Sequence, residues 1–249
     1  MEHYTIQRRA LKQDARAAMR EHKPSVYMVT FVFLLITLVL ETLSTKLQFP
    51  GFKMEEIIRY GYDEDLIMRL WYAEAGRSGA SRLLDLAIAI MSGMLSGGFA
   101  LFCMYVSQRR AAGVGTLFDL FGFFFRFLWL EIVMGFFIFL WSLLLVIPGI
   151  VAAYRYSMAE FIFFESPEKG ALQCIRESKA MTMGYKGQLF VLDLSFLGWG
   201  ILSVIPFVSI FTMPYIGVTK ANYYRVLSGQ MNENGAPRQQ QYYSEPWDQ

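Results

Sequence analysis

Long runs of apolar residues alternate with short polar segments along this chain. The most informative run extends from Leu128 to Ala153, holds a single charge at Glu131, and is broken only at Pro148-Gly149. A hydrocarbon core about 30 Å thick is crossed by a helix of roughly 20 apolar residues. Because the run exceeds that length, the pattern predicts a protein embedded in a membrane.

The apolar runs together predict an all-α, polytopic membrane domain over residues 25–227, with about six transmembrane helices. Proline is expected to centre the short hairpins at Pro148-Gly149 and at Pro206. Five spans with a kinked or re-entrant segment after Pro148 are the alternative. The six expected spans are 26–44, 83–106, 125–147, 150–164, 188–205 and 207–224.

The polar segments between the runs predict the remaining parts of the chain. Ser166, Pro167 and Glu168 carry helix-start signals, and Gly184 carries a stop signal, so a helix is expected between them. The four expected polar parts are a basic amphipathic segment on the membrane surface (1–24), a loop with short interfacial helices (45–82), a helix (166–184) and a disordered tail (228–249).

Lysine and arginine are distributed unevenly between the two sides of this topology. They exceed the acidic residues in segments 1–24, 107–126 and 166–187, whereas loop 45–82 is balanced. Positively charged loops stay on the cytoplasmic side. The distribution predicts a bacterial cytoplasmic (cell) membrane protein with both termini and helix 166–184 in the cytoplasm and loop 45–82 outside.

Two apolar stretches resemble each other. WSLLLVIPGI at 141–150 and WGILSVIPFV at 199–208 both place a tryptophan seven residues before a proline that follows Val-Ile. Repeats of this kind are common in transport folds. Either an internal repeat or a chance similarity between two apolar stretches explains this resemblance.

The second predicted span contains small residues at a spacing of four. Small residues spaced in this way let two helix backbones approach closely in lipid. We expect a helix-packing seam here, with a substrate groove as the unsupported alternative. The residues are Ser92, Gly93, Ser96 and Gly97.

Four charged residues fall inside predicted spans, where each costs at least about 2.5 kcal/mol at the centre of a helix. Arg155 is expected to meet a carboxylate from another span, with Asp193 or Glu131 as its partner. The cluster is either a structural ion pair or a polar site for an ion, a lipid headgroup or a peptide. The candidate site residues are Arg155, Asp193, Glu131, Glu160, Tyr156 and Ser157.

Composition excludes several classes of function. Apolar residues make up 55% of the 249 and charged residues only 18%, against about a quarter in soluble domains. A net charge of +2 without a basic aromatic patch argues against nucleic acid binding. Because no catalytic, phosphate-binding or zinc motif is present, we expect no enzyme activity, no cofactor and no metal. Cys103 and Cys174 are expected to be inert thiols.

A distinctive combination of residues begins at the Pro148-Gly149 break and extends to Pro214-Tyr215. Its members are Pro148-Gly149, Tyr156–Ala159, Pro167, Ala171, Ile175, Ser178, Met181, Gly184, Lys186, Leu192–Ser195 and Pro214-Tyr215. This combination resembles a bacterial multi-pass membrane family, domain of unknown function 975, although Glu160 stands where many members have a proline. The resemblance covers about residues 105–228 and implies an integral membrane protein, with no established biochemical activity.

The expected function is that of a non-enzymatic, transport-related or export-accessory membrane protein with a polar site inside the membrane. The alternative is a structural or regulatory scaffold that packs against another membrane protein through the small-residue seam. The expected partners are the lipid bilayer and, in addition, another membrane protein, a lipid or a peptide.

Overall fold

The computed structural model describes residues 6–48, 68, 79–203 and 205–232. Within this part of the chain the regular elements are helical, as expected for an all-α protein. In chain order they are α1 (Arg8–Glu21), α2 (Val26–Gln48), α5 (Gly79–Ser107), the 3-10 helix η1 (Val114–Phe123), α6 (Phe124–Leu144), α7 (Val146–Tyr156), α8 (Ala159–Glu165), α9 (Ala171–Met181), α10 (Lys186–Leu194), α11 (Leu197–Leu202) and α12 (Pro206–Leu227).

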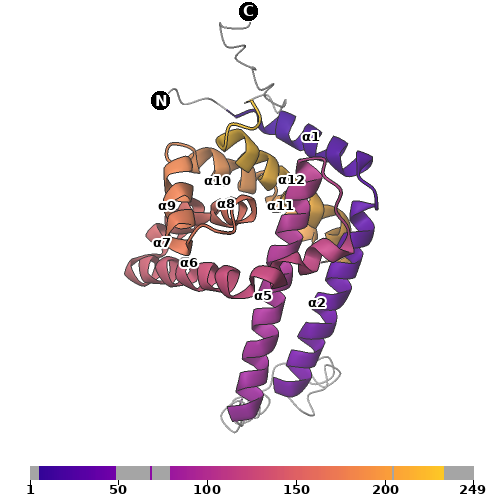
Figure 1. Ribbon diagram of the computed structural model, residues 1–249, viewed down its shortest axis with the longest axis vertical. Helices are drawn as coiled ribbons and strands as arrows, with labels where there is room; N and C mark the ends of the chain where they lie inside the picture. The colour runs from indigo at the N-terminus through magenta and orange to yellow at the C-terminus, as the bar shows by residue number, and fades with distance from the viewer. Residues whose placement is uncertain (1–5, 49–67, 69–78, 204, 233–249) are drawn as a thin grey trace, which may run out of the picture.

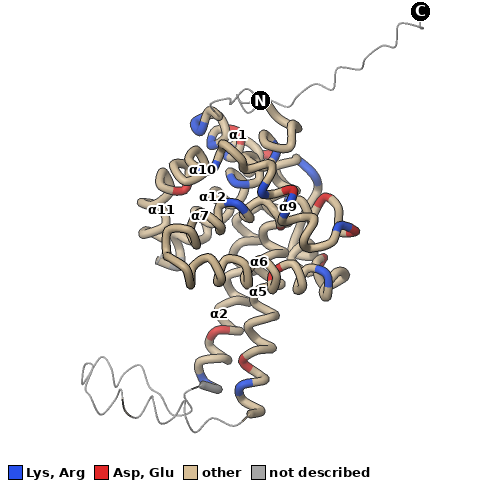
Figure 2. The backbone as a smooth tube through the Cα atoms, turned by 90° about the vertical axis from the view of Figure 1, so that its left-hand side faces the viewer, with Lys and Arg blue, Asp and Glu red and all other residues tan. Residues whose placement is uncertain are grey.

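Three helical segments in the described residues are long and apolar enough to cross a membrane: Val26–Lys46, Gly79–Ser107 and Val114–Leu144. These three apolar helices are compatible with a membrane protein. Helices α2 and α5 run side by side as a long hairpin that projects from a head formed by the other helices, whereas α6 runs across their direction (Figure 1). The projecting hairpin is also evident in Figure 2.

Two of the expected spans are divided between short helices. Segment 150–164 contains most of α7, with 11 residues in that helix, followed by α8 with 7. Segment 188–205 contains α10 and α11, with 9 and 6 residues. A helix of 11 residues is only about 16 Å long. Both breaks occur at a serine, Ser157 or Ser195, whose hydroxyl donates to the carbonyl three residues earlier and so competes with the helix.

The break after α6 lies earlier than the expected turn at Pro148-Gly149. Leu145 adopts an extended conformation and separates α6 from α7, and Pro148 lies inside the first turn of α7, where its missing N–H costs nothing. Helices α6 and α7 pack against each other. A Cβ on Gly149 would lie 2.1 Å from the Ser142 hydroxyl, so glycine permits this close packing. Pro206 is the first residue of α12.

The two similar stretches share a local structure. The N–H of Leu145 donates to the carbonyl of Trp141 at 3.2 Å, and the N–H of Ser203 donates to the carbonyl of Trp199 at 2.9 Å. In both places the tryptophan lies in the last turn of a helix, and the proline lies in the first turn of the next one.

The predicted start of helix 166–184 is wrong. Helix α9 begins at Ala171, because Ser166 ends α8 and is followed by a turn in which Lys169 N–H donates to the Ser166 carbonyl. Its end is close to the expectation, with Gly184 in the left-handed region at φ 83°. Ile175 and Ser178 are buried, whereas Leu172 is exposed.

The small residues of α5 divide between two environments. A Cβ on Gly98 would meet the backbone of Leu117, and a Cβ on Gly97 would meet the ring of Phe127, so the seam packs inside the chain against η1 and α6. Gly93 has nothing within 4 Å, and Ser92 is half-buried. Close packing is therefore formed at Gly97 and its neighbour Gly98 and not at Gly93.

Helix α1 is amphipathic, as the sequence predicts, but its apolar face contacts protein. Leu11, Ala15, Ala18 and Met19 are buried, and α1 packs on α12 and α5. The apolar face of α1 therefore packs against protein and does not lie on the lipid surface, where the sequence placed it. The expected loop 45–82 and tail 228–249 lie largely outside the described residues.

Candidate functional site

A pocket of about 280 Å³ opens where α5, α8, α10 and α12 meet. Its polar lining comes from five residues that are far apart in the sequence. Phe99, Phe161 and Leu189 supply apolar walls, so the polar groups sit in an otherwise apolar surrounding. We call it the polar pocket, and its polar lining residues are Ser96, Ser157, Glu160, Asp193 and Lys220.

An ion pair crosses the polar pocket. The Lys220 Nζ on α12 lies 3.2 Å from the Asp193 Oδ1 on α10. The side chains are 40% and 28% exposed, so the pair is only partly screened from its surroundings. The sequence predicts Asp193 or Glu131 as the partner of Arg155, and neither pairing is formed among the described residues.

Two more of the predicted charges gather beside this ion pair. Glu160 lies in the first turn of α8, lines the pocket and interacts electrostatically with Lys220. Glu131 on α6 lies within electrostatic range of Glu160. Its Oε1 is buried and has no hydrogen-bond partner. Asp193 and Glu160 thus share one lysine, and Glu131 lies next to Glu160.

Arg155 has a different environment. Its carbonyl accepts hydrogen bonds from the hydroxyls of Ser178 at 2.8 Å and Thr182 at 3.3 Å. Its Nε is buried without a hydrogen-bond partner, and no carboxylate among the described residues pairs with it. Tyr156 is buried against Phe137 of α6, with ring centroids 6.4 Å apart. The sequence places both in the site, but neither lines the pocket.

Sequence reasoning missed Lys220. It is the one charged residue in the predicted span 207–224, so the rule that identified the other charges applied equally to it. Gly217, one turn earlier on α12, lets the helices approach closely, because a Cβ there would lie 2.6 Å from the Cys103 sulfur. This approach brings Lys220 over the pocket.

A second polar cluster lies between α1, α5 and α12, and we call it the interhelix junction. The Ser107 hydroxyl donates to Asn222 Oδ1 at 2.6 Å. The Asn222 Nδ2 donates to the Leu11 carbonyl at 3.2 Å and to Asp14 Oδ2 at 3.0 Å. Asn222 is fully buried and its amide is bonded on both sides.

Arg109 closes the junction at the surface. Its guanidinium donates to Asp14 at 2.9 Å and to Glu21 at 3.0 Å. Burial alone lowers the pKa of Arg109, but the bonds to the two carboxylates outweigh it and raise the pKa overall. The guanidinium therefore stays charged and ties the end of α5 to α1.

The chemistry of the polar pocket is that of an ionic binding site. Cys103 lies at its wall, but the side chain is fully buried, and burial disfavours a reactive thiolate. Within the described ranges, no three His, Cys, Asp or Glu side chains are placed to hold a metal ion. The groups present can bind a charged ligand, exchange ion partners or carry a proton.

In a comparison with known proteins, part of the chain matches a family of unknown function. Residues 143–231 match the family described as Protein of unknown function (DUF975), the family that the sequence resembles. This segment includes α7 to α12 and contributes Glu160, Asp193 and Lys220 to the polar pocket. No curated protein and no solved structure matched the chain.

Proposed function

We propose that this chain is a non-enzymatic, multi-pass protein of the bacterial cell membrane that acts in transport or as an export accessory, with the polar pocket as its binding site. The observation that carries the proposal is the set of incompletely paired charges around an open hollow. Charges in lipid-embedded segments are expensive and mark ligand or ion pathways more often than charges in soluble proteins do.

The balance of charge indicates the class of ligand. Glu160 and Asp193 line the pocket with Lys220, and Glu131 lies next to Glu160, so acidic groups outnumber basic ones. A cationic group that enters the hollow gains carboxylate partners, and Asp193 exchanges Lys220 for the ligand. An organic ammonium group or a proton fits this arrangement, whereas an anion meets repulsion.

The proposed topology has six membrane segments with both termini in the cytoplasm. Helices α2, α5, α6 and α12 are the long segments, and the short helices α7–α8 and α10–α11 form the two broken segments. Broken helices are tolerated at membrane depth where they are buried in protein or line a polar cavity, and Ser157 and Asp193 lie at such a cavity.

A scaffold that binds another membrane protein through the small-residue seam is the second candidate. The observation in its favour is the open surface at Gly93, which lies on α5 beside the exposed Met91. Gly97 packs inside the chain, so only part of the seam is left for a partner. This division favours the pocket over the seam.

The test uses the full chain in lipid nanodiscs and tetramethylammonium chloride as the probe, with sodium chloride at equal ionic strength as the reference. Binding at a hundred times Kd stabilises a folded protein by about 2.7 kcal/mol, which raises Tm by about 5 °C or more at this size. We expect this shift in the wild type and its loss in Glu160→Gln and Asp193→Asn. Glu168→Gln removes an exposed carboxylate outside the pocket and keeps the shift.

Equal melting in both salts contradicts the cationic site. Native mass spectrometry of the same preparations then separates the two candidates. A small molecule retained by the wild type and lost in Asp193→Asn supports a binding protein. A stoichiometric protein partner that is retained by all variants supports the scaffold.

A further inference from the structure

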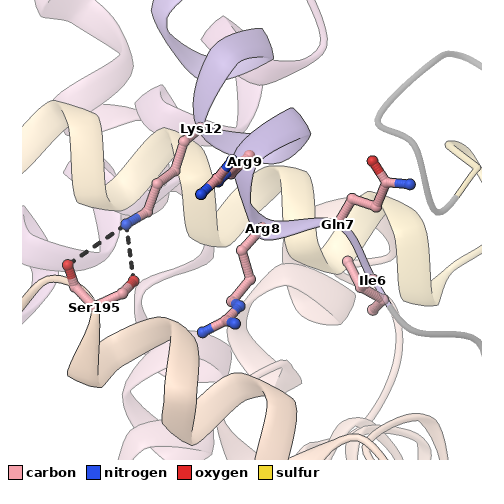
Figure 3. Close-up of a pocket in the computed structure, with 6 residues that line it drawn as sticks. All are labelled: Ile6, Gln7, Arg8, Arg9, Lys12 and Ser195. Atoms are coloured by element: carbon pink, nitrogen blue, oxygen red, sulfur yellow. Dashed lines mark hydrogen bonds between the residues drawn. The ribbon is translucent and has the colours of Figure 1, made fainter.

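A second hollow lies at the start of α1, away from the polar pocket. It has a volume of about 420 Å³ and is lined by Ile6, Gln7, Arg8, Arg9, Lys12 and Ser195. The lining thus combines three cations with a hydroxyl and contains no carboxylate. Figure 3 shows Arg8 and Lys12 extending from α1 towards the segment that carries Ser195.

Lys12 is held in place within this hollow. Its Nζ donates to the Ser195 hydroxyl at 2.8 Å and lies 3.9 Å from the centre of the Phe196 ring. Burial, followed by the charges of Arg8 and Arg16, lowers the pKa of Lys12. The cations therefore repel one another in a preformed arrangement, and an anion relieves this repulsion.

The arginines leave donors available for an anion. In the described part of the chain, the Arg8 and Arg9 side chains are exposed and make no ion pair or hydrogen bond. Helix α1 also begins here, without a side-chain cap and without an acidic residue in its first turn. Its first backbone N–H groups carry partial positive charge, which favours an anion at this end.

The surface beside the hollow is apolar. Ser195 lies between Leu194 and Leu197, which are 53% and 57% exposed, and the surface continues along α11 with Ile201 at 68%. A ligand bound at the arginines therefore has an exposed hydrocarbon surface next to it. Phosphate groups carry charge that matches guanidinium donors, and acyl chains match the apolar surface.

We propose that the hollow formed by Arg8, Arg9, Lys12 and Ser195 is a binding site for the phosphate headgroup of an anionic phospholipid, whose acyl chains lie along α10 and α11. The headgroup bridges α1 to the α10–α11 break. Such a lipid holds α1 against the helices that carry Asp193 of the polar pocket. The site is independent of the function proposed for that pocket.

The experiment uses the full chain in nanodiscs of phosphatidylglycerol and phosphatidylcholine in equal amounts. The protein is released from the nanodiscs, and the lipids that stay bound to it are identified by native mass spectrometry. A basic group near an anionic surface contributes about a fivefold change in affinity, so the triple variant R8Q/R9Q/K12Q loses about a hundredfold. We expect phosphatidylglycerol to be enriched in the wild type, and the enrichment to disappear in the triple variant.

The control is R20Q, which removes one exposed arginine from the last turn of the same helix and keeps the enrichment. Should the triple variant fail to fold by circular dichroism, the single variants R8Q, R9Q and K12Q each show about a fivefold loss. Equal retention of both lipids by the wild type overturns the proposal. Complete displacement of phosphatidylglycerol by inorganic phosphate overturns it as well, because the acyl chains then contribute nothing.

Discussion

The interhelix junction and the polar pocket are both built on α5 and α12, yet they satisfy their polar groups in opposite ways. In the junction, the fully buried Asn222 bonds to Ser107, the Leu11 carbonyl and Asp14. In the pocket, Lys220 lies two residues earlier on α12 and pairs with Asp193. Glu131, next to Glu160, keeps a buried oxygen without a hydrogen bond.

The difference separates a structural role from a binding role. A buried amide that is bonded on both sides in a low-dielectric interior rigidifies the packing and has no capacity left for a ligand. A cluster of polar groups that is only partly hydrogen-bonded destabilises the folded protein, and a ligand or ion that binds in the open volume beside it can restore that stability. The junction therefore holds α1, α5 and α12 together, and the pocket is the place where the molecule is able to bind something.

The largest expected effect is loss of stability in the junction. Asn222→Ala leaves the Ser107 hydroxyl, the Leu11 carbonyl and Asp14 without their amide partner. We expect the free energy of unfolding to fall by about 2–4 kcal/mol, measured by chemical denaturation in detergent micelles. Gln13→Ala, an exposed amide on α1, is the control and is expected to change it by less than about 0.5 kcal/mol. A result as small for Asn222→Ala as for the control refutes the structural role.

The ion pair of the pocket is expected to contribute less. Lys220→Met leaves Asp193 and Glu160 without their cation and destabilises the protein by about 1–2 kcal/mol, because the pair is partly exposed. The double variant Lys220→Met/Asp193→Leu regains most of this loss, but tetramethylammonium does not stabilise it, because Asp193 is absent. A double variant that regains its stability and is still stabilised by tetramethylammonium makes the pair structural only.

Helix α5 contributes a serine to each region, and the two serines differ in their accessibility to solvent. Ser96 lines the pocket and is exposed, whereas Ser107 is fully buried in the junction. In a Cys103→Ala/Cys174→Ala background, Ser96→Cys is expected to react with a small maleimide at least about tenfold faster than Ser107→Cys. Labelling rates are read by mass spectrometry. Equal rates contradict the open pocket.

The smallest effect is expected at a partly exposed ion pair outside both regions, which serves as a reference for them. Lys169 Nζ lies 2.7 Å from Glu177 Oε2, and this hydrogen bond lowers the pKa of Glu177 below its ordinary value of 4.5. The pair stabilises the fold above pH 4.5 and loses its effect as the pH falls through the lowered pKa. Glu177→Gln is expected to cost at most about 1 kcal/mol at pH 7 and nothing once Glu177 is protonated, by denaturation at both pH values.

The sequence predicted much of the local structure. Apolar run lengths identified the three long helices, and segment 1–24 was predicted to be amphipathic, as α1 is. The start of α9 was predicted wrongly, because Ser166 and Pro167 read as a helix start but form a turn after α8. Local signals do not tell which of two neighbouring helices a capping residue ends or begins.

The candidate site was predicted only in part. Three of its acidic residues were identified because charge is rare in apolar runs, and Ser157 was placed beside them. The partner of Asp193 was predicted wrongly, since Arg155 is near in sequence to the pocket but Lys220 is near in space. Gly217 permits that approach, which no spacing within α12 indicates.

The sequence by itself determined that this protein is helical and that three of its helices are long and apolar enough for a membrane. This follows from run length and composition, which are local properties. Only the tertiary structure decided which charges meet, that Ser96 faces a hollow while Gly97 packs inside, and that Lys12 of α1 meets Ser195. Such contacts depend on how helices cross, and crossing is set by the packing of side chains that are far apart in the sequence.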